Sequence, residues 1–156
     1  MFDKNYISLL MRFGMTLVLL SGMFGTSPVM PVAAATLTVI TTNDSGAGSL
    51  RQAVADAVSG DTITFDLSLA GQTITLASDL TIDKNLTIDG SGLSPQITIS
   101  GGDVAKISVV SSPVITISNL TITNGNAGAI FSGGNLTIQN STLKNNAGWT
   151  ITVNGS

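Results

Sequence analysis

The chain of 156 residues contains no cysteine and no histidine, and only 4% of its residues are aromatic. A protein without cysteine is held together without disulfides. The absence of histidine removes the side chain that most often serves as acid and base near neutral pH. A core with so few rings must be built from many stacked isoleucine, leucine and valine side chains, and this favours a repetitive fold.

Charged residues are scarce as well, at 10% of the chain, and the formal net charge is −3. From Thr36 onward there are eight aspartates, no glutamate, three lysines and a single arginine, Arg51. Proteins that bind nucleic acid neutralise its phosphates with many basic side chains. A sparse and slightly acidic surface therefore argues against a nucleic-acid partner.

The first 35 residues are predicted to be a signal peptide. Lys4 and Arg12 give a basic start, residues 15–20 form an apolar run, and small residues at Ala33–Ala35 provide a cleavage site. A membrane anchor is the alternative, but the apolar run has only about half of the roughly 20 residues that a membrane span needs. We expect cleavage after Ala35, a mature chain without a transmembrane span, and a secreted or cell-surface location.

A helix is predicted from Ser49 to Val58. Ser49 suits the N-cap position, Leu50, Val54 and Val58 fall on one face, and Gly60 supplies the stop. A single short helix ahead of many strands is typical of an element that covers the open apolar end of a solenoid.

The rest of the chain, residues 61–156 after a cap at 36–60, consists of short segments between asparagine, aspartate and glycine. Aliphatic residues alternate with threonine in each segment, so that one face meets a core and the other meets water. Such short strands are unstable as hairpins, whereas in a parallel solenoid each one pairs with its equivalents in neighbouring turns. The predicted strands are 36–40, 62–65, 73–76, 80–82, 86–88, 97–99 and 115–117.

A repeat is visible toward the C-terminal end. Residues 115–124 align with residues 136–145, and the alignment matches aliphatic with aliphatic positions and Asn119 with Asn140. This offset predicts turns of about 21 residues, four or five of them in all. The similar segments that begin at Asn85 and Asn119 are separated by an interval that is no multiple of this period. Either a loop is inserted between them or they lie on different faces.

The repeat also predicts a bend at Asn119. Ile117 and Leu120 both belong to the aliphatic face although they are three residues apart, which a flat strand does not allow. A corner resets the phase, because asparagine tolerates the left-handed backbone that corners need. We expect Asn119 and Asn140 to stack at this corner and to form a short hydrogen-bonded ladder.

The cap region carries a resemblance to a known group of proteins. Residues 43–54 read N-D-S-G-A-G-S-L-R-Q-A-V, and residues 59–65 read S-G-D-T-I-T-F. Both segments resemble the N-terminal cap of large bacterial surface β-helix proteins, which usually reads C-S-L-R-E-A-I followed by G-D-T-I. This sequence departs from that pattern at Gly48, Gln52 and Val54.

Segments such as residues 116–125 resemble the repeats of polymorphic outer-membrane and pectin-lyase-like proteins. The resemblance covers nearly all of the chain after residue 35 and implies an all-β fold, a right-handed parallel β-helix with a short N-terminal capping helix. The right hand is also the rule for parallel crossovers. The resemblance further implies structural roles for Ser49 and Leu50, and a fixed structural contact for Arg51.

Four aspartates at strand ends are the candidates for catalysis or metal binding. The enzymes that share the resembled fold use clustered carboxylates, which either hold Ca²⁺ or act as an acid/base pair. Asp79, Asp83, Asp89 and Asp103 instead occur singly, where aspartate commonly closes turns. We therefore predict no catalytic, cofactor-binding or metal-binding residue and no cofactor.

Three functions remain in view, because this fold supports many activities. The leading interpretation is an exported, adhesin-like and non-catalytic scaffold that binds a carbohydrate or a host or cell-surface ligand along its length. The alternative is a fragment of a carbohydrate-active enzyme, either a polysaccharide lyase or a glycoside hydrolase of the pectin-lyase-like group. The third is a structural segment without a ligand of its own.

Thr-x-Thr triplets recur along the chain, as they do on the flat face of ice-binding β-helices. Their spacing is uneven, so we interpret them as ordinary solvent-facing strand positions. They lie at 36–38, 62–64, 73–75, 121–123 and 150–152.

The last residues predict a solenoid that is incomplete at its C-terminal end. A strand begins at Trp149, and no capping element follows Val153. We expect the last turn to leave Ile138, Leu143 and Ile151 uncovered together with a row of unpaired backbone groups. Such edges pair with other chains, so self-association through this open turn is expected.

Overall fold

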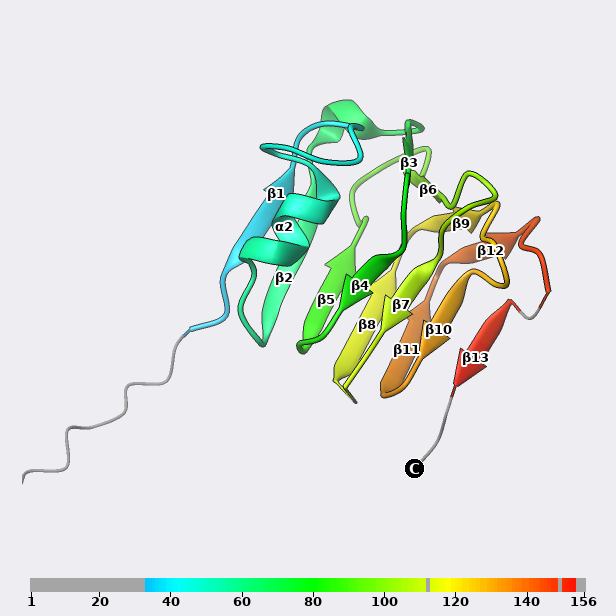
Figure 1. Ribbon diagram of the computed structural model, residues 1–156. Helices are drawn as coiled ribbons and strands as arrows, with labels where there is room; N and C mark the ends of the chain where they lie inside the picture. Colours follow the sequence, from blue (N-terminus) through cyan, green and yellow to red (C-terminus); the bar gives the residue numbers. More distant parts are fainter. Residues whose placement is uncertain (1–32, 112, 149, 154–156) are drawn as a thin grey trace, which may run out of the picture. The chain divides into compact units, whose positions relative to one another are not determined.

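The computed structural model describes residues 33–111, 113–148 and 150–153 (Figure 1). The predicted signal peptide lies outside the described residues, apart from its last three, Ala33–Ala35. The described residues form three parallel sheets, which we call A, B and C.

The strands of each sheet come from regularly recurring positions in the chain. Sheet A contains β1 (Thr36–Val39), β2 (Asp61–Phe65), β5 (Leu86–Asp89), β8 (Val114–Ser118) and β11 (Asn135–Gln139). Sheet B contains β3 (Thr73–Thr75), β6 (Thr98–Ser100), β9 (Thr121–Thr123) and β12 (Thr142–Lys144). Sheet C contains β4 (Leu80–Ile82), β7 (Ile107–Val109), β10 (Ile130–Ser132) and β13 (Ile151–Val153). The helix α2 (Leu50–Asp56) and the 3₁₀ helix η1 (Leu67–Leu69) complete the described elements.

The chain passes through sheets A, B and C in turn and then returns to sheet A one level further along. Neighbouring strands are parallel in all three sheets. The strands of sheet A mark about five turns (Figure 1). The predicted fold, a right-handed parallel β-helix with a short N-terminal helix, is confirmed.

The period predicted from the repeat applies only to the last turns. Leu120 and Ser141, in equivalent connections of these turns, are 21 residues apart. Asp89 and Ser118, which pair across β5 and β8, are 29 residues apart. Most of this difference in turn length lies in the connection from sheet A to sheet B. That connection consists of residues 90–97 after β5 but only of residues 119–120 after β8.

Both explanations offered for the irregular interval between similar segments are correct. A longer connection is inserted after β5, and the two segments lie on different faces of the β-helix. The segment that begins at Asn85 leads into β5 of sheet A, whereas the one that begins at Asn119 leads into β9 of sheet B. Similar strands recur on all faces because every face obeys the same alternation of aliphatic and polar residues.

The predicted phase of the strands is confirmed. Ile117 and Leu120 are fully buried although they are three residues apart. Asn119 between them has φ 58°, and Asn140 at the equivalent corner has φ 49°. Both corners therefore use the left-handed backbone, which asparagine tolerates better than most residues.

The expected ladder between the two asparagines is not what the structure contains. Asn119 Nδ2 donates to Asp89 Oδ1 at 2.8 Å, while the Asn140 carbonyl accepts from Gln96 Nε2 at 2.8 Å. Asp89 pairs with Ser118 in the register of sheet A, so its carboxylate lies beside the corner. A carboxylate is the stronger acceptor for an amide N–H, and it takes the place of the neighbouring amide.

The helix of the cap is shorter than predicted. Ser49 occupies the N-cap position and accepts a hydrogen bond from Gln52 N, and Leu50 and Val54 are buried. The helix ends at Asp56, so Val58 is 51% exposed and lies outside the helical face that the sequence indicated. Within the described residues there is no helix long and apolar enough to cross a membrane.

Candidate functional site

A column of five threonines runs along the outer face of sheet A. Register pairing connects each threonine to its equivalent in the next turn. We call this set the sheet A column; it consists of Thr36, Thr62, Thr87, Thr116 and Thr137. All five side chains are exposed or half-buried, because their neighbours in each strand are the ones that point into the core.

A second column lies on sheet B. Thr73, Thr98, Thr121 and Thr142 pair in register through β3, β6, β9 and β12. Sheet C does not continue the pattern, because its equivalent positions are Thr81, Ser108, Phe131 and Thr152. Two of the three faces therefore present a regular line of threonines, and the third does not.

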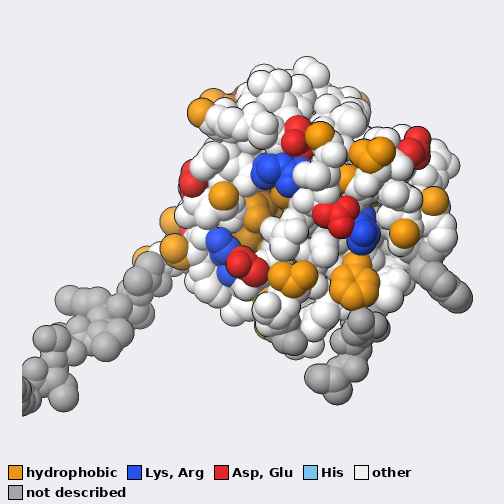
Figure 2. All heavy atoms as spheres, in the orientation of Figure 1, with side chains coloured by type: hydrophobic (Ala, Val, Ile, Leu, Met, Phe, Trp, Pro, Cys, Tyr) orange, Lys and Arg blue, Asp and Glu red, His pale blue; other side chains and the backbone are white. Residues whose placement is uncertain are grey.

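The hydroxyls of the sheet A column are available to a ligand. Within the described part of the chain, none of these five hydroxyls donates a hydrogen bond to another protein group or accepts one from it. By contrast, the hydroxyl oxygens of Thr38 and Thr64, in the same two strands as Thr36 and Thr62, lie 3.3 Å apart, within hydrogen-bond distance. On the face drawn in Figure 2, most of the blue side chains lie next to red ones, and neutral side chains cover most of the remaining surface. Each free hydroxyl can donate one hydrogen bond and accept two.

The uneven spacing of the Thr-x-Thr triplets does not prevent this alignment. The threonines of the column recur at unequal intervals along the chain and still lie in register, because the extra residues of the longer turns form connections between strands. Sequence spacing alone concealed the column. The signal that would have found it is the aliphatic residue on either side of each threonine, which fixes the strand register.

Arg51 ties the cap to the first turn. Its Nε and Nη2 donate to the two carboxylate oxygens of Asp44 at 3.3 and 2.7 Å, and its Nη1 and Nη2 donate to the carbonyls of Asp79 and Ser78 at 2.9 and 2.8 Å. Asp44 also accepts from Ala77 N. The hydrogen bond from Arg51, reinforced by that from Ala77, holds the pKa of Asp44 below its ordinary value although burial acts in the opposite direction. Arg51 thus connects α2 to the loop that contains Asp44 and to the segment that contains Ser78 and Asp79 before β4.

Lys84 completes the attachment of the helix. Its Nζ donates to the carbonyls of Val54, Ala55 and Ala57 at 3.3, 3.4 and 3.1 Å. These carbonyls belong to the last turn of α2, where backbone acceptors lack partners within the helix and where positive charge is favourable. Lys84 therefore acts as a cap for the carboxyl end of α2.

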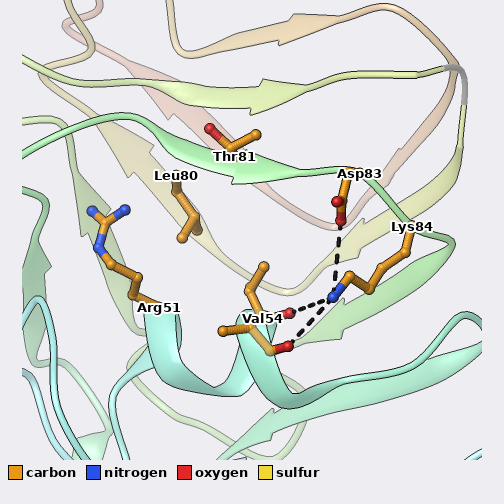
Figure 3. Close-up of a pocket in the computed structure, with 7 residues that line it drawn as sticks. Arg51, Val54, Leu80, Thr81, Asp83 and Lys84 are labelled. Carbon is orange, nitrogen blue, oxygen red and sulfur yellow. Dashed lines mark hydrogen bonds and ion pairs between the residues drawn. The ribbon is translucent and has the colours of Figure 1, made fainter.

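A cleft of about 280 Å³ lies between α2 and β4 (Figure 3). Its walls are formed by Arg51, Val54, Ala55, Leu80, Thr81, Asp83 and Lys84. Both of its cations are already engaged, Arg51 by Asp44 and backbone carbonyls and Lys84 by the helix end. The cleft is therefore a seam between the cap and the first turn, without a free charge to select a ligand.

The four candidate aspartates are dispersed and perform local structural tasks. Asp79 accepts from Lys106 Nζ at 2.9 Å and from its backbone N–H at 3.1 Å. Asp83 Oδ1 lies 3.8 Å from Lys84 Nζ, and Asp103 has a left-handed φ of 61° in a turn. Within the described ranges, no three carboxylates or other metal-binding side chains form a cluster.

Asp89 has the richest set of partners among them. Burial acts to raise its pKa, but hydrogen bonds from Ser91, Asn119 and Ser118 outweigh burial, and the pKa of Asp89 lies below its ordinary value. A carboxylate that is stabilised in its ionised form by three side chains is suited to holding the corner of a turn. It is a poor proton donor, which is what a general acid must be.

Comparisons with known proteins found no match, so the function is inferred from the geometry of the chain itself. No protein-family model matches the chain, and neither a curated protein nor a solved structure matches it.

Proposed function

We propose that this protein is an exported, non-catalytic β-helix scaffold that binds a carbohydrate or another repeating cell-surface polymer along its length. The sheet A column carries the proposal. It presents five threonines in register, with hydroxyls that have no partner within the described protein.

The spacing of the column suits a polymer. Neighbouring strands of a sheet lie about 4.8 Å apart, so the column repeats a hydroxyl and a methyl group at a constant interval. Threonine is β-branched and stiff at χ1, and its strands are fixed by pairing on both sides for most of the column. A rigid array of this kind loses little conformational entropy on binding, so many weak hydrogen bonds add up.

A carbohydrate-active enzyme receives less support from the same surface. Such an enzyme needs a carboxylate pair or a carboxylate-bound cation beside the scissile bond. Asp79 is engaged by Lys106, Asp83 by Lys84 and Asp89 by the side chains around it, and within the described residues no three metal-binding side chains form a cluster. Export and surface location rest on the sequence of the first 35 residues and on the resemblance of residues 43–54 and 59–65 to a bacterial surface cap.

A binding experiment with a matched variant tests the proposal. The secreted protein is incubated with a panel of immobilised neutral and acidic polysaccharides, and retention is measured together with any release of new sugar ends. We expect retention on at least one polymer without release of sugar ends. Thr62→Val, Thr87→Val and Thr116→Val combined remove three hydroxyls while keeping the shape and β-propensity, and retention should fall at least tenfold.

Control substitutions on sheet C separate the column from general effects. Thr81→Val and Ser108→Ala alter equivalent positions on the face that lacks a column, and retention should be unchanged. Retention that is lost equally in both variants, or no retention on any polymer, would contradict the proposal. Release of sugar ends would favour the enzyme instead.

Self-association is a second part of the proposal. Within the described residues, β11, β12 and β13 each pair with a strand on one side only, and Ile151 is 41% exposed. An unpaired strand edge beside exposed aliphatic side chains is a surface on which another chain can add strands. We expect the mature chain to associate with increasing concentration in sedimentation velocity. A single monomeric species over a hundredfold range of concentration would contradict this part.

A further inference from the structure

Asp61 is the only charged residue that is buried within the described part of the chain, with 3% of its surface exposed. It lies at the start of β2, directly before the first threonine of that strand. Its Oδ1 accepts from Ala35 N and its Oδ2 accepts from Val58 N, both at 2.8 Å. These two backbone hydrogen bonds, that from Val58 first, hold the pKa of Asp61 below its ordinary value, so the carboxylate is ionised.

No basic side chain among the described residues forms an ion pair with Asp61. Arg51 pairs with Asp44, Lys84 with Asp83 and Lys106 with Asp79. Lys144 is exposed on β12, in the last turn of sheet B. A buried carboxylate normally has a positive partner, because removing a charge from water is costly. Here its two partners are backbone N–H groups, and one of them belongs to Ala35.

Ala35 is part of the folded sheet. Its N–H donates to Asp61, and its carbonyl accepts from Thr62 N at 2.9 Å. β1 begins at the next residue, Thr36, which pairs with Thr62. Cleavage after Ala35 would remove both hydrogen bonds from the mature protein, whereas cleavage one residue earlier would keep both.

We propose that the leader is removed between Ala34 and Ala35, and that the new α-amino group of Ala35 becomes the counter-ion of Asp61. The inference rests on the proposed export. A signal peptidase would hydrolyse the peptide bond with water: the carbonyl carbon of Ala34 gains the oxygen and leaves as a carboxylate, and the nitrogen of Ala35 becomes an ammonium group. Ala34 is small, as the residue before such a cleavage must be.

The processed amino group then has a distinct chemical signature. An α-amino group ordinarily has a pKa of about 7.7–8.0. The ionised carboxylate of Asp61 favours the charged form, so the pKa of the Ala35 amino group is raised. As long as Asp61 is ionised, the pairing therefore stabilises the fold fully below about pH 7.7, the unfolded value of the amino group, and this stabilisation is lost as the pH rises through the raised pKa of the folded state.

The first experiment determines where the exported protein begins. The complete gene is expressed in an exporting bacterium, and the secreted product is analysed by N-terminal sequencing and intact mass. We expect Ala35 as the first residue. A product that begins at Thr36 overturns this inference but leaves export standing, whereas a product that retains Met1 or Met11 overturns export itself.

Two matched substitutions test which peptide bond is cut. Ala34→Leu places a large residue before the proposed bond, and the product that begins at position 35 should be lost. Ala35→Leu places the same residue after the proposed bond, and the protein should still begin at position 35. The opposite pattern, with Ala35→Leu blocking cleavage and Ala34→Leu tolerated, overturns the inference.

The pairing itself is tested on the processed protein by NMR titration of the Ala35 amino group. Its pKa should lie at least half a unit above that of the same group in the Asp61→Asn variant, which keeps the shape and removes the charge. Equal values in the two proteins would overturn the pairing. If Asp61→Asn does not fold, the pKa of the Ala35 amino group in the native protein is the test. A value within the ordinary range of α-amino groups would contradict the pairing with Asp61.

Discussion

The turn formed by β8, β9 and β10 and the turn formed by β11, β12 and β13 contain the same kinds of residues in the same register, yet their burial differs. Ile115, Ile117, Ile122 and Ile130 in the former turn are at most 3% exposed. Their register partners in the latter turn are Leu136, Ile138, Leu143 and Ile151, which are half-buried or exposed. The inward direction of a side chain is therefore a local property, whereas its burial is supplied by the turn that follows.

The two ends of the described β-helix differ for the same reason. At the N-terminal end, α2 covers the core with Leu50 and Val54, and Arg51 and Lys84 tie it to the first turn. At the other end, no described element covers β11, β12 or β13. A cap in this fold therefore needs apolar residues that cover the core and cations that bind carbonyls without a partner in the helix or the sheet.

The largest effect is expected from the core pair at equivalent positions. Ile117→Ala removes a fully buried side chain and should lower the free energy of unfolding by about 2–5 kcal/mol. Ile138→Ala makes the same change on a half-buried side chain and should cost roughly half as much. Urea unfolding of the two variants provides the measurement. Equal losses would show that the last turn is covered as well as the one before it.

An intermediate effect is expected from Arg51→Ala in the cap. This change removes the arginine hydrogen bonds to the carbonyls of Ser78 and Asp79 and leaves the Asp44 carboxylate with the hydrogen bond from Ala77 N alone, and it should cost about 1–3 kcal/mol. Part of that cost depends on pH. Because the pKa of Asp44 is lowered in the fold, its contribution is present above the unfolded value of 3.8 and is lost as the pH falls through the lowered one.

Unfolding curves at pH 7 and pH 3 measure this dependence. The difference between the native protein and Arg51→Ala should shrink at the lower pH. Lys144→Ala, on the exposed face of β12, is the control and should change stability little at either pH. A difference that stays constant would show that the ion pair with Asp44 contributes nothing.

How much of this could be predicted from the sequence depends on the range of the interaction. The phase of Ile117 and Leu120 and the bend at Asn119 follow from a few neighbouring residues, and the structure agrees with them. The partner of Asn119 did not follow, because Asp89 lies 30 residues away in a turn of different length. Val58 was misplaced because a C-cap depends on one backbone angle at Ala57, which carries no clear residue signal.

The candidate site was hidden for a related reason. The threonines of the sheet A column are evident in the sequence, but their alignment depends on how many residues each connection absorbs. The sequence did not single out Asp61 among the aspartates. Only the three-dimensional pairing of β1 with β2 brings Ala35 to it.

The smallest effect is expected at the corners. Asn119→Ala and Asn140→Ala both place alanine in a left-handed backbone, at a cost of about 1 kcal/mol each. Asn119→Ala also removes the hydrogen bond to Asp89, so it should cost more. Asn119→Gly keeps the backbone and loses only the bond, and should recover part of the loss in thermal unfolding. Equal losses of stability in Asn119→Ala and Asn140→Ala would show that the hydrogen bond between Asn119 and Asp89 does not stabilise the corner.

The most direct test of the central claim, that each turn is completed by the next, is amide hydrogen exchange at Ile117 and Ile138. Asn119 N donates to Gln139 O at 3.1 Å, and the alternation of a parallel ladder then directs the Ile117 amide toward β11 and the Ile138 amide away from β8. At a dilution where the mature protein is monomeric, we predict slow exchange at Ile117 and exchange at least a hundredfold faster at Ile138. Equal protection of the two amides would contradict the claim.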